Sequence, residues 1–170
     1  PNLVPKRPEW TKHLLKNRAP QCPFPARLLG VDLGKKTIGL AVSNDMQTVA
    51  TPLETVKRTK FSQDVIALAA VLDDYNIQGI VFGYPLHMDG RRSGGCDAVE
   101  SFVDEMRKHD SVAGRHLWIA FHDERLSTVS VEESVDQFVD KKSAKESGVT
   151  DKLAAQVILQ GALDYMARQR

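Results

Sequence analysis

The chain has 170 residues, of which 42% are hydrophobic and 26% are charged, and its formal net charge is +1. This length suits a single domain with a core of its own, and no apolar run reaches the roughly 20 residues that cross a bilayer. A net charge near zero excludes the overall positive field that marks many nucleic-acid-binding proteins, so any contact with a nucleic acid would come from a local patch.

The first 26 residues differ in composition from the rest of the chain. They hold most of the prolines, and their only acidic residue is Glu9. Residues 9–15 have the spacing of a short helix, whereas the prolines that follow predict no regular structure up to Ala26. The stretch has neither the serines of a transit peptide nor the apolar segment of a secretion signal. We interpret residues 1–26 as a proline-rich N-terminal extension, draped on the domain or disordered, and residues 27–170 as the domain itself.

From Arg27 onward the hydrophobic pattern is regular and changes between strand and helix spacing. The predicted elements are strands over residues 27–33, 38–43 and 49–56, a helix over 61–75, a strand over 79–82, a helix over 96–108, a strand over 117–122, a helix over 127–138, a polar, lysine-rich stretch over 140–150, and a last helix over 151–166. Three strands in a meander followed by alternating helices and strands are typical of an α/β layer fold with a mixed sheet.

Acidic residues stand where α/β sheets place their ligands. Asp32 ends the first strand, Asp123 and Glu124 end the last strand, and Asp151 opens the final helix at the edge of an apolar stripe that faces the sheet. Three carboxylates from distant parts of the chain can thus converge at one end of the sheet. Phosphodiester cleavage requires such ligands, because carboxylates hold Mg²⁺ or Mn²⁺ and two ions about 3.5–4 Å apart activate water and stabilise the leaving oxygen.

Each acid also has a structural interpretation. An aspartate in the first turn of a helix is favoured by the helix dipole alone, so Asp151 taken by itself is equally well a cap. Asp123, Glu124 and Arg125 could form a surface turn with an internal ion pair. Asp32 is the hardest to explain structurally, because it interrupts an apolar strand.

Four motifs resemble those of the YqgF/RuvX family. "LLGVDLGKKTIGLAVS" (28–43) is similar to the family's opening hairpin, and "VFGYPLHMDG" (81–90) is similar to its G-x-P-x-N-M-D-G loop. "HDERLSTVSVEE" (122–133) resembles its D-E-R-L-[ST]-T block, and "DKLAAQVILQGALD" (151–164) resembles its closing helix. The motifs occur in the family's order across residues 27–166.

The resemblance implies a ribonuclease H-like fold, in which a five-stranded mixed sheet of order 3-2-1-4-5 has helices on both faces. It implies a metal-dependent endonuclease that either processes the 5′ end of the 16S rRNA precursor or resolves Holliday junctions. Asp32, Glu124 and Asp151 would then be catalytic acids and ligands of Mg²⁺ or Mn²⁺, with Asp123 as the alternative to Glu124.

The same resemblance suggests which residues would contact the substrate. Lys35, Lys36, Arg125 and Asp89 are the predicted substrate-binding residues, because the first three can bind phosphates and the fourth lies in the loop that resembles the family's G-x-P-x-N-M-D-G motif. Further local cations follow the third strand, namely Lys57, Arg58 and Lys60, for which a solvated turn is the alternative.

The chain departs from the family pattern in the loop that contains Asp89. It has Tyr84-Pro85 and His87 where the family usually has Leu-Pro and Asn, and residues 91–96 follow a different pattern. The fourth strand ends in Gly83 without an acid, unlike some relatives of this fold. These departures put the choice of substrate in doubt and weaken a direct transfer of the junction-resolvase mechanism.

Two functions of other classes compete with the nuclease. The D-x-G hairpin at Asp32 resembles the phosphate-binding hairpin of actin-like ATPases, but such proteins close two domains on a nucleotide, and this chain has one such hairpin and no Walker A loop. The second alternative is a non-catalytic nucleic-acid-binding or ribosome-assembly factor on a nuclease fold. Retention of all three acids argues against it.

The expected partner is structured RNA or branched DNA, bound without a membrane by a monomer or a homodimer. Cys22 and Cys96 lack both CxxC and Cys/His spacing, so we expect free thiols, neither zinc nor a disulfide, and a cytoplasmic location.

Overall fold

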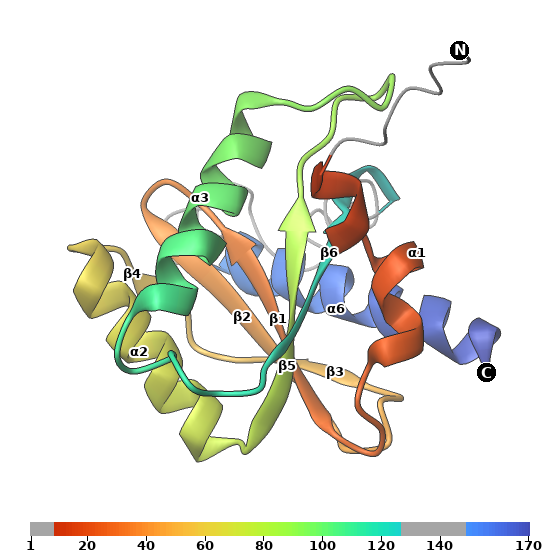
Figure 1. Ribbon diagram of the computed structural model, residues 1–170, viewed down its shortest axis with the longest axis horizontal. Coiled ribbons are helices and arrows are strands. Elements are labelled where there is room, and N and C mark those ends of the chain that lie inside the picture. The colour runs from red at the N-terminus through yellow and green to blue at the C-terminus, as the bar shows by residue number, and fades with distance from the viewer. Residues whose placement is uncertain (1–8, 127–148) are drawn as a thin grey trace, which may run out of the picture.

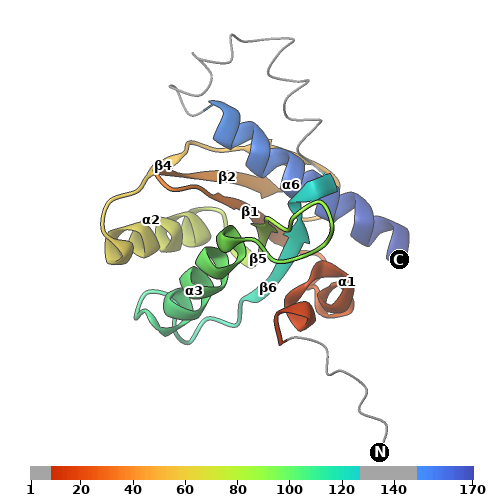
Figure 2. The ribbon, with the colours of Figure 1, turned by 90° about the horizontal axis from the view of Figure 1, so that it is seen from above.

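The fold is built around a mixed sheet with helices on both faces, as the computed structural model of residues 9–126 and 149–170 shows (Figure 1, Figure 2). The described elements, in chain order, are η1 (Glu9–His13), α1 (Leu15–Arg18), η2 (Ala19–Gln21), β1 (Arg27–Leu33), β2 (Thr37–Ser43), β3 (Ala50–Pro52), β4 (Val56–Lys57), α2 (Phe61–Asp74), β5 (Ile77–Tyr84), α3 (Gly94–Lys108), β6 (Trp118–Asp123), η3 (Glu124–Leu126) and α6 (Val149–Gln169).

The strand order confirms the predicted topology. Neighbouring strands follow the path β3-β2-β1-β5-β6, which is the expected order 3-2-1-4-5. The pairs β1–β2 and β2–β3 are antiparallel, and β1–β5 and β5–β6 are parallel. The expected count of five strands is wrong, because the third predicted strand is divided into β3 and β4, which both pair with β2. Pro52 ends β3, since proline has no N–H to donate to a ladder.

Most element boundaries lie close to the predicted ones. β5 begins before and ends after residues 79–82, and α6 begins at Val149 rather than residue 151. The predicted helix over residues 127–138 and all but the end of the polar stretch over 140–150 lie outside the described residues.

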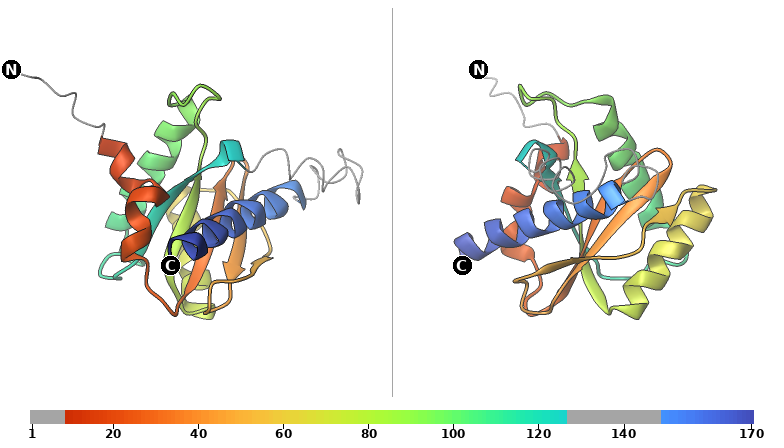
Figure 3. Two further views of the ribbon diagram at one scale, coloured as in Figure 1. Left: turned by 90° about the vertical axis from the view of Figure 1, so that its right-hand side faces the viewer. Right: turned by 180° about the vertical axis from the view of Figure 1, so that it is seen from behind.

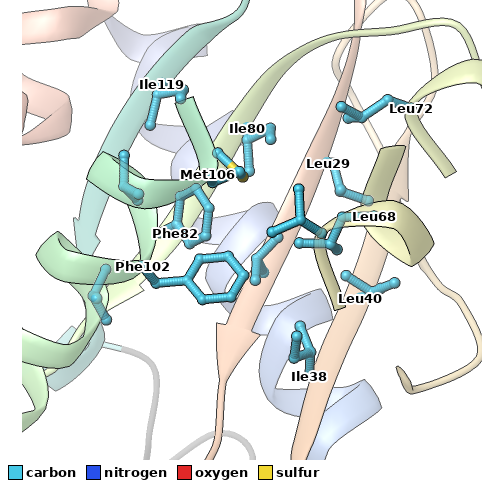
Figure 4. Close-up of a cluster of buried hydrophobic side chains, with 14 of the residues drawn as sticks. Leu29, Ile38, Leu40, Leu68, Leu72, Ile80, Phe82, Phe102, Met106 and Ile119 are labelled. Carbon is cyan, nitrogen blue, oxygen red and sulfur yellow. The ribbon is translucent and has the colours of Figure 1, made fainter. Parts of the chain in front are cut away.

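The two faces of the sheet carry different helices. α2 and α3 cover one face over a core that includes Leu68, Phe82 and Phe102 (Figure 4). α6 crosses the other face (Figure 3). Its predicted apolar stripe is confirmed, because every member is at most 2% exposed: Ala155, Ile158, Leu159, Ala162 and Met166.

A glycine in β1 lets α6 approach the sheet closely. A Cβ at Gly30 would lie 2.6 Å from the Cβ of Leu159 and 3.0 Å from the carbonyl oxygen of Ala155. The absent side chain therefore brings the first half of α6 directly onto β1, two residues before Asp32.

Residues 9–21, here called the N-terminal segment, lie draped along the outer edge of β6 (Figure 2). Leu15 is buried, the guanidinium of Arg18 donates to the carbonyl of Ile119 (3.2 Å), and the Trp118 indole donates to the carbonyl of Arg18 (2.9 Å). The expectation of no regular structure before Ala26 is wrong for η2, which contains Pro20, because proline is tolerated in the first turn of a helix.

Candidate active site

The central feature of the site is a contact between two carboxyl groups. Asp32 lies near the carboxyl end of β1, and Glu124 directly follows β6. A side-chain hydrogen bond joins the two carboxyls, so the structure brings together two of the predicted catalytic acids.

Gly83 makes this contact possible. β5 lies between β1 and β6 in the sheet, so the Glu124 side chain has to pass over β5 to reach Asp32. A Cβ at Gly83 would clash with Oε1 of Glu124 and would lie 2.7 Å from Cδ1 of Ile158. Some relatives of this fold have an acid at the position of Gly83. In this structure, the space left by the missing side chain of Gly83 is occupied by the Glu124 carboxyl.

The environment of Glu124 disfavours its charged form. Burial, the charge of Asp32, the hydrogen bond to Asp32 and the charge of Asp123 together raise the pKa of Glu124 to about 7. Desolvation and a nearby like charge both act in this direction. The pair is therefore costly to ionise near neutral pH, and a bound divalent cation would reverse that cost.

Asp123 takes part in a different interaction. Both of its oxygens accept hydrogen bonds from Nε of Arg125 (3.0 and 2.8 Å), and Nη2 of Arg125 lies 2.5 Å from Oδ2. Burial opposes ionisation of Asp123, but the hydrogen bonds and charge of Arg125 lower the pKa of this carboxyl below its usual value. Of the two neighbouring acids, Glu124 faces Asp32 and Asp123 is paired with a cation.

Strand alternation explains this division. Trp118 and Ala120 belong to the core beneath α6, whereas Ile119 and Phe121 belong to the core beneath α2 and α3. Glu124 follows in the same alternation as Trp118 and Ala120, so its side chain lies on the α6 face of the sheet. Leu28 and Gly30 of β1 face α6 as well, and Asp32 is the next residue in their alternation. The sequence alone could not assign this parity, because it depends on which strand face α6 covers.

Asp151 lies in the first turn of α6. It precedes Ala155, whose carbonyl packs near Gly30 of β1, by about one helical turn. The side chain of Asp151 lies outside what the structure describes, so its convergence with Asp32 and Glu124 remains a prediction. Among the side chains that are described, no group of three or more His, Cys, Asp or Glu residues could hold a metal ion.

The predicted phosphate-binding cations differ in their contacts. Lys35 and Lys36 are exposed in the turn between β1 and β2. Arg58 supports that turn, because its Nη1 donates to the carbonyl of Gly34 (2.8 Å) and its Nε lies 3.5 Å from Oδ2 of Asp64. Arg58 therefore has a structural role, whereas the phosphate contacts of the lysines remain predictions. Lys57 and Lys60, the remaining predicted cations, are also exposed.

The loop after β5 is closed by its own charged residues. Asp89 accepts hydrogen bonds from the backbone N–H (3.0 Å) and Nε (2.5 Å) of Arg91, which together with the other contacts of Asp89 lower the pKa of its carboxyl. Arg92 donates to the Tyr84 hydroxyl (3.2 Å) and pairs with Glu100. The departures from the family pattern at Arg91 and Arg92 thus hold the loop in shape, and Asp89, a predicted substrate-binding residue, is occupied by Arg91.

Arg125 connects this loop to the acids. Its Nη1 donates to the carbonyl of Met88 (3.2 Å), while its other nitrogens hold Asp123. The internal ion pair that the sequence allowed for residues 123–125 is present, between Arg125 and Asp123.

The sequence analysis did not single out His122, a buried residue of β6 that packs against α6. Its side chain is 7% exposed, and a Cβ at Gly161 would lie 2.9 Å from Nε2 of the ring. Burial lowers the pKa of His122, so the ring is neutral at pH 7. A histidine in a buried strand directly before two acids is a signal that the sequence did contain.

Comparisons with known proteins show which sequences and folds this chain resembles. Residues 26–165 match the sequence model of the family RuvX, described as Holliday junction resolvase. A protein of Ruegeria pomeroyi is 46% identical over 144 residues, which cover 85% of this chain and 89% of the relative. A protein of Paramagnetospirillum magneticum is 45% identical over 138 residues, which cover 81% and 85%. Both relatives are named "Putative pre-16S rRNA nuclease".

A solved structure shares the fold. Thermus thermophilus RuvC in complex with a Holliday junction substrate matches with a TM-score of 0.53 at 13% identity, over 84% of this chain and 96% of that chain. The predicted ribonuclease H-like fold is thereby confirmed. Within residues 9–126 and 149–170, no helix has the length and apolar character needed to span a membrane.

Proposed function

This chain belongs to the RuvX family of nucleases, and we propose that Asp32 and Glu124 form the metal-binding centre of an endonuclease that cleaves structured nucleic acid. The observation that carries the proposal is the hydrogen-bonded contact of these two carboxyls across Gly83. Carboxyl groups in contact are unfavourable for the stability of a fold unless a cation or a shared proton compensates them, so their placement favours a functional role.

The donor set fits a hard divalent cation. Asp32 and Glu124 offer oxygen ligands, and we propose Asp151 as the third, all of which suit Mg²⁺ or Mn²⁺. When bound, a pair of such ions would activate water and stabilise the leaving oxygen of the phosphodiester. The raised pKa of Glu124 means that this carboxyl has to release its proton before it can bind a cation near neutral pH.

The remaining site residues are proposed to position the substrate. Lys35 and Lys36 extend from the turn next to Asp32 and can bind the phosphate backbone. Arg125 holds the loop around Met88 against Asp123 and so fixes the entrance to the site. Asp89 has a smaller role than the sequence suggested, because Arg91 already occupies its carboxyl.

Two substrates follow from what the relatives are called. The names of the curated relatives point to the 5′ end of the 16S rRNA precursor, and the family description points to a four-way DNA junction. Paired cuts in a junction need two active sites and hence a homodimer, whereas a monomer suffices for the RNA. We propose the RNA precursor as the first substrate, in the cytoplasm.

The alternative is a non-catalytic nucleic-acid-binding or ribosome-assembly factor on the same fold. It predicts binding without cleavage, whatever the metal. The contact between Asp32 and Glu124 argues against it, because a factor that only binds has no need for paired carboxyls.

A cleavage panel tests the proposal. Fragments of the 16S precursor, single-stranded RNA, duplex DNA and a four-way junction are each incubated with the full chain and with Mg²⁺, Mn²⁺ or EDTA. We expect metal-dependent cuts in at least one structured substrate and none in EDTA. Tight binding without cleavage of any substrate by either metal would support the non-catalytic alternative.

A further inference from the structure

A cleft of about 360 Å³ lies between the N-terminal segment and the end of β6, and the proposed cleavage chemistry does not require it. Trp10, Leu14 and Lys16 of the segment form one wall, and Phe121 and Arg125 form part of the other. Its volume falls within the range of about 300–1,000 Å³ that is usual for small-molecule sites. The family match begins at residue 26, so one wall comes from residues outside the matched region.

The wall formed by the N-terminal segment is fixed to the fold. Leu14 and Phe121 pair as a parallel β-bridge along the edge of β6. The Trp10 ring stacks on Tyr84, with 5.5 Å between ring centroids, and Tyr84 stacks on Phe121 at 4.9 Å. Backbone pairing and ring stacking together give the cleft a defined shape in the absence of a ligand.

The cleft borders the chain segment that carries Glu124. Asp123 and Arg125 line it, and Glu124 lies between them in the chain. Gly90 lines the cleft as well and belongs to the loop that Arg125 holds through the carbonyl of Met88. A group bound in the cleft would therefore lie beside residues 123–125, the segment that carries Glu124.

The lining has the chemistry of a nucleobase site. Trp10 and Tyr165 provide aromatic surface and Leu14 adds apolar surface, whereas the ring of Phe121 is 2% exposed and stacks on Tyr84. Lys16, which is exposed, adds positive charge for a phosphate, whereas the charge of Arg125 is balanced by Asp123. Aromatic rings that stack on a base, next to cations that bind the backbone, are how proteins hold unpaired nucleotides.

We propose that this cleft takes up one unpaired base of the nucleic acid, next to the phosphodiester that is cut. The inference rests on the proposed nuclease function and narrows its substrate to strands with an unstacked or flipped nucleotide near the cleavage point. A base inside a continuous duplex is stacked and paired, so it would have to be extruded before it could enter.

The direct test is an NMR titration of the full chain with adenosine 5′-monophosphate, up to about 10 mM, which detects millimolar dissociation constants. We expect the indole N–H of Trp10 and the amides of Leu14 and Gly90 to shift. The Trp118 indole, which is bonded to the carbonyl of Arg18, is the internal reference and should stay unmoved. Inorganic phosphate should shift far less, because it cannot stack. No shift at Trp10, or equal shifts with phosphate alone, would overturn the proposal.

Two lysines of the same segment provide a matched pair of variants. Lys16 lines the cleft, whereas Lys12 lines a neighbouring hollow with His13 and Arg107, and both are exposed. Lys16→Glu should weaken the binding of adenosine 5′-monophosphate about three- to fivefold, the effect of one exposed charge contact, whereas Lys12→Glu should change it less than about twofold. Equal effects of the two substitutions would show that only overall charge matters and would overturn the proposal.

A cleavage experiment separates this inference from the proposed function. The single-stranded part of a cleaved substrate is prepared with an abasic site at successive positions around the cut. One position should slow cleavage by the wild-type protein, and that position marks the base in the cleft. Equal cleavage at every abasic position would overturn the inference and leave the nuclease intact. If adenosine 5′-monophosphate shifts Trp10 but the protein cuts no substrate, the proposed nuclease function is wrong. The proposal that the bound base lies next to a cleaved phosphodiester is then wrong as well.

Discussion

Two acidic regions of this protein that are shielded from solvent to different degrees have opposite surroundings. Asp64, in the first turn of α2, is 2% exposed, accepts a hydrogen bond from the backbone N–H of Thr59 (3.0 Å) and lies 3.5 Å from Nε of Arg58. Glu124, at the end of β6, is set against Asp32, and its pKa is raised to about 7. Asp64 is the more buried acid, whereas Asp32 and Glu124 are half-buried, so the degree of burial does not mark the functional acid. The two acids differ in the charge of their partner, which is a cation for Asp64 and a second carboxyl group for Glu124.

Neutralising the carboxyl pair should have the largest effect. Asp32→Asn or Glu124→Gln should reduce cleavage by at least on the order of 100-fold, because each removes a proposed metal ligand. Asp123→Asn is the control, since Asp123 is paired with Arg125 rather than Asp32. It should retain more activity than Glu124→Gln, as measured by initial rates on the same substrate. A greater loss in Asp123→Asn would mean that the two neighbouring acids have been assigned in the wrong order.

Neutralising Asp64 should affect the stability of the fold rather than the cleavage reaction. Asp64→Asn weakens the contacts with Arg58 and Thr59 and should lower the free energy of unfolding by about 1–3 kcal/mol, as for other hydrogen bonds to a buried charge. Urea unfolding measures the loss. Cleavage at a temperature well below the melting point should stay within a few-fold of the wild type. If Asp64→Asn is as stable as the wild type, the contacts of Asp64 with Arg58 and Thr59 do not stabilise the fold, and the comparison with Glu124 fails.

The pH dependence of stability provides a third comparison. In the folded protein Glu124 keeps its proton up to about pH 7, whereas a glutamate in the unfolded chain releases it near its ordinary pKa of 4.5. The free energy of unfolding without metal should therefore fall as the pH rises from about 4.5 to 7 and stay reduced above that. Glu124→Gln should remove that part of the decrease, on the order of 1–3 kcal/mol at pH 8. Parallel curves for wild type and variant in EDTA would contradict the raised pKa.

The smallest expected effect concerns salt. With a net charge of +1 and few exposed lysines near the acids, binding should involve few phosphates. A plot of log K against log salt concentration should have a slope of about −2 to −4, from roughly one unit for each phosphate contacted. Fluorescence anisotropy with the preferred substrate provides the measurement. A slope of about −6 or steeper would point to a basic surface that these residues do not account for.

Hydrophobic period and chain order predicted an α/β layer fold with a mixed sheet, and the strand order was predicted from the resemblance to the YqgF/RuvX family. The sequence also predicted the stripe of α6 that Ala155 and Leu159 represent, since residues four apart share one face of a helix. The division of residues 49–56 into β3 and β4 was not predicted, although Pro52 was a signal for it.

The candidate site was predicted in part. Asp32 and Glu124 were expected to converge, and they are in contact. The choice between Glu124 and Asp123 could not be made, because it depends on which face of the sheet α6 covers. The roles of Gly83 and Arg58 depend on contacts between strands and turns that are distant in sequence, and no local pattern encodes those.

The most direct test of the carboxyl pair is thermal unfolding of the wild type, Asp32→Asn and Glu124→Gln at about pH 8, above the pKa of Glu124, each in EDTA and in excess Mg²⁺. We predict that both variants melt at or above the wild-type temperature in EDTA, because each removes repulsion between Asp32 and Glu124. Mg²⁺ should then stabilise the wild type by an amount set by its concentration and affinity, and the variants by less. Variants that melt below the wild type in EDTA, gain as much from Mg²⁺ and still cleave normally would show that the two acids are structural, and the account of the site would be wrong.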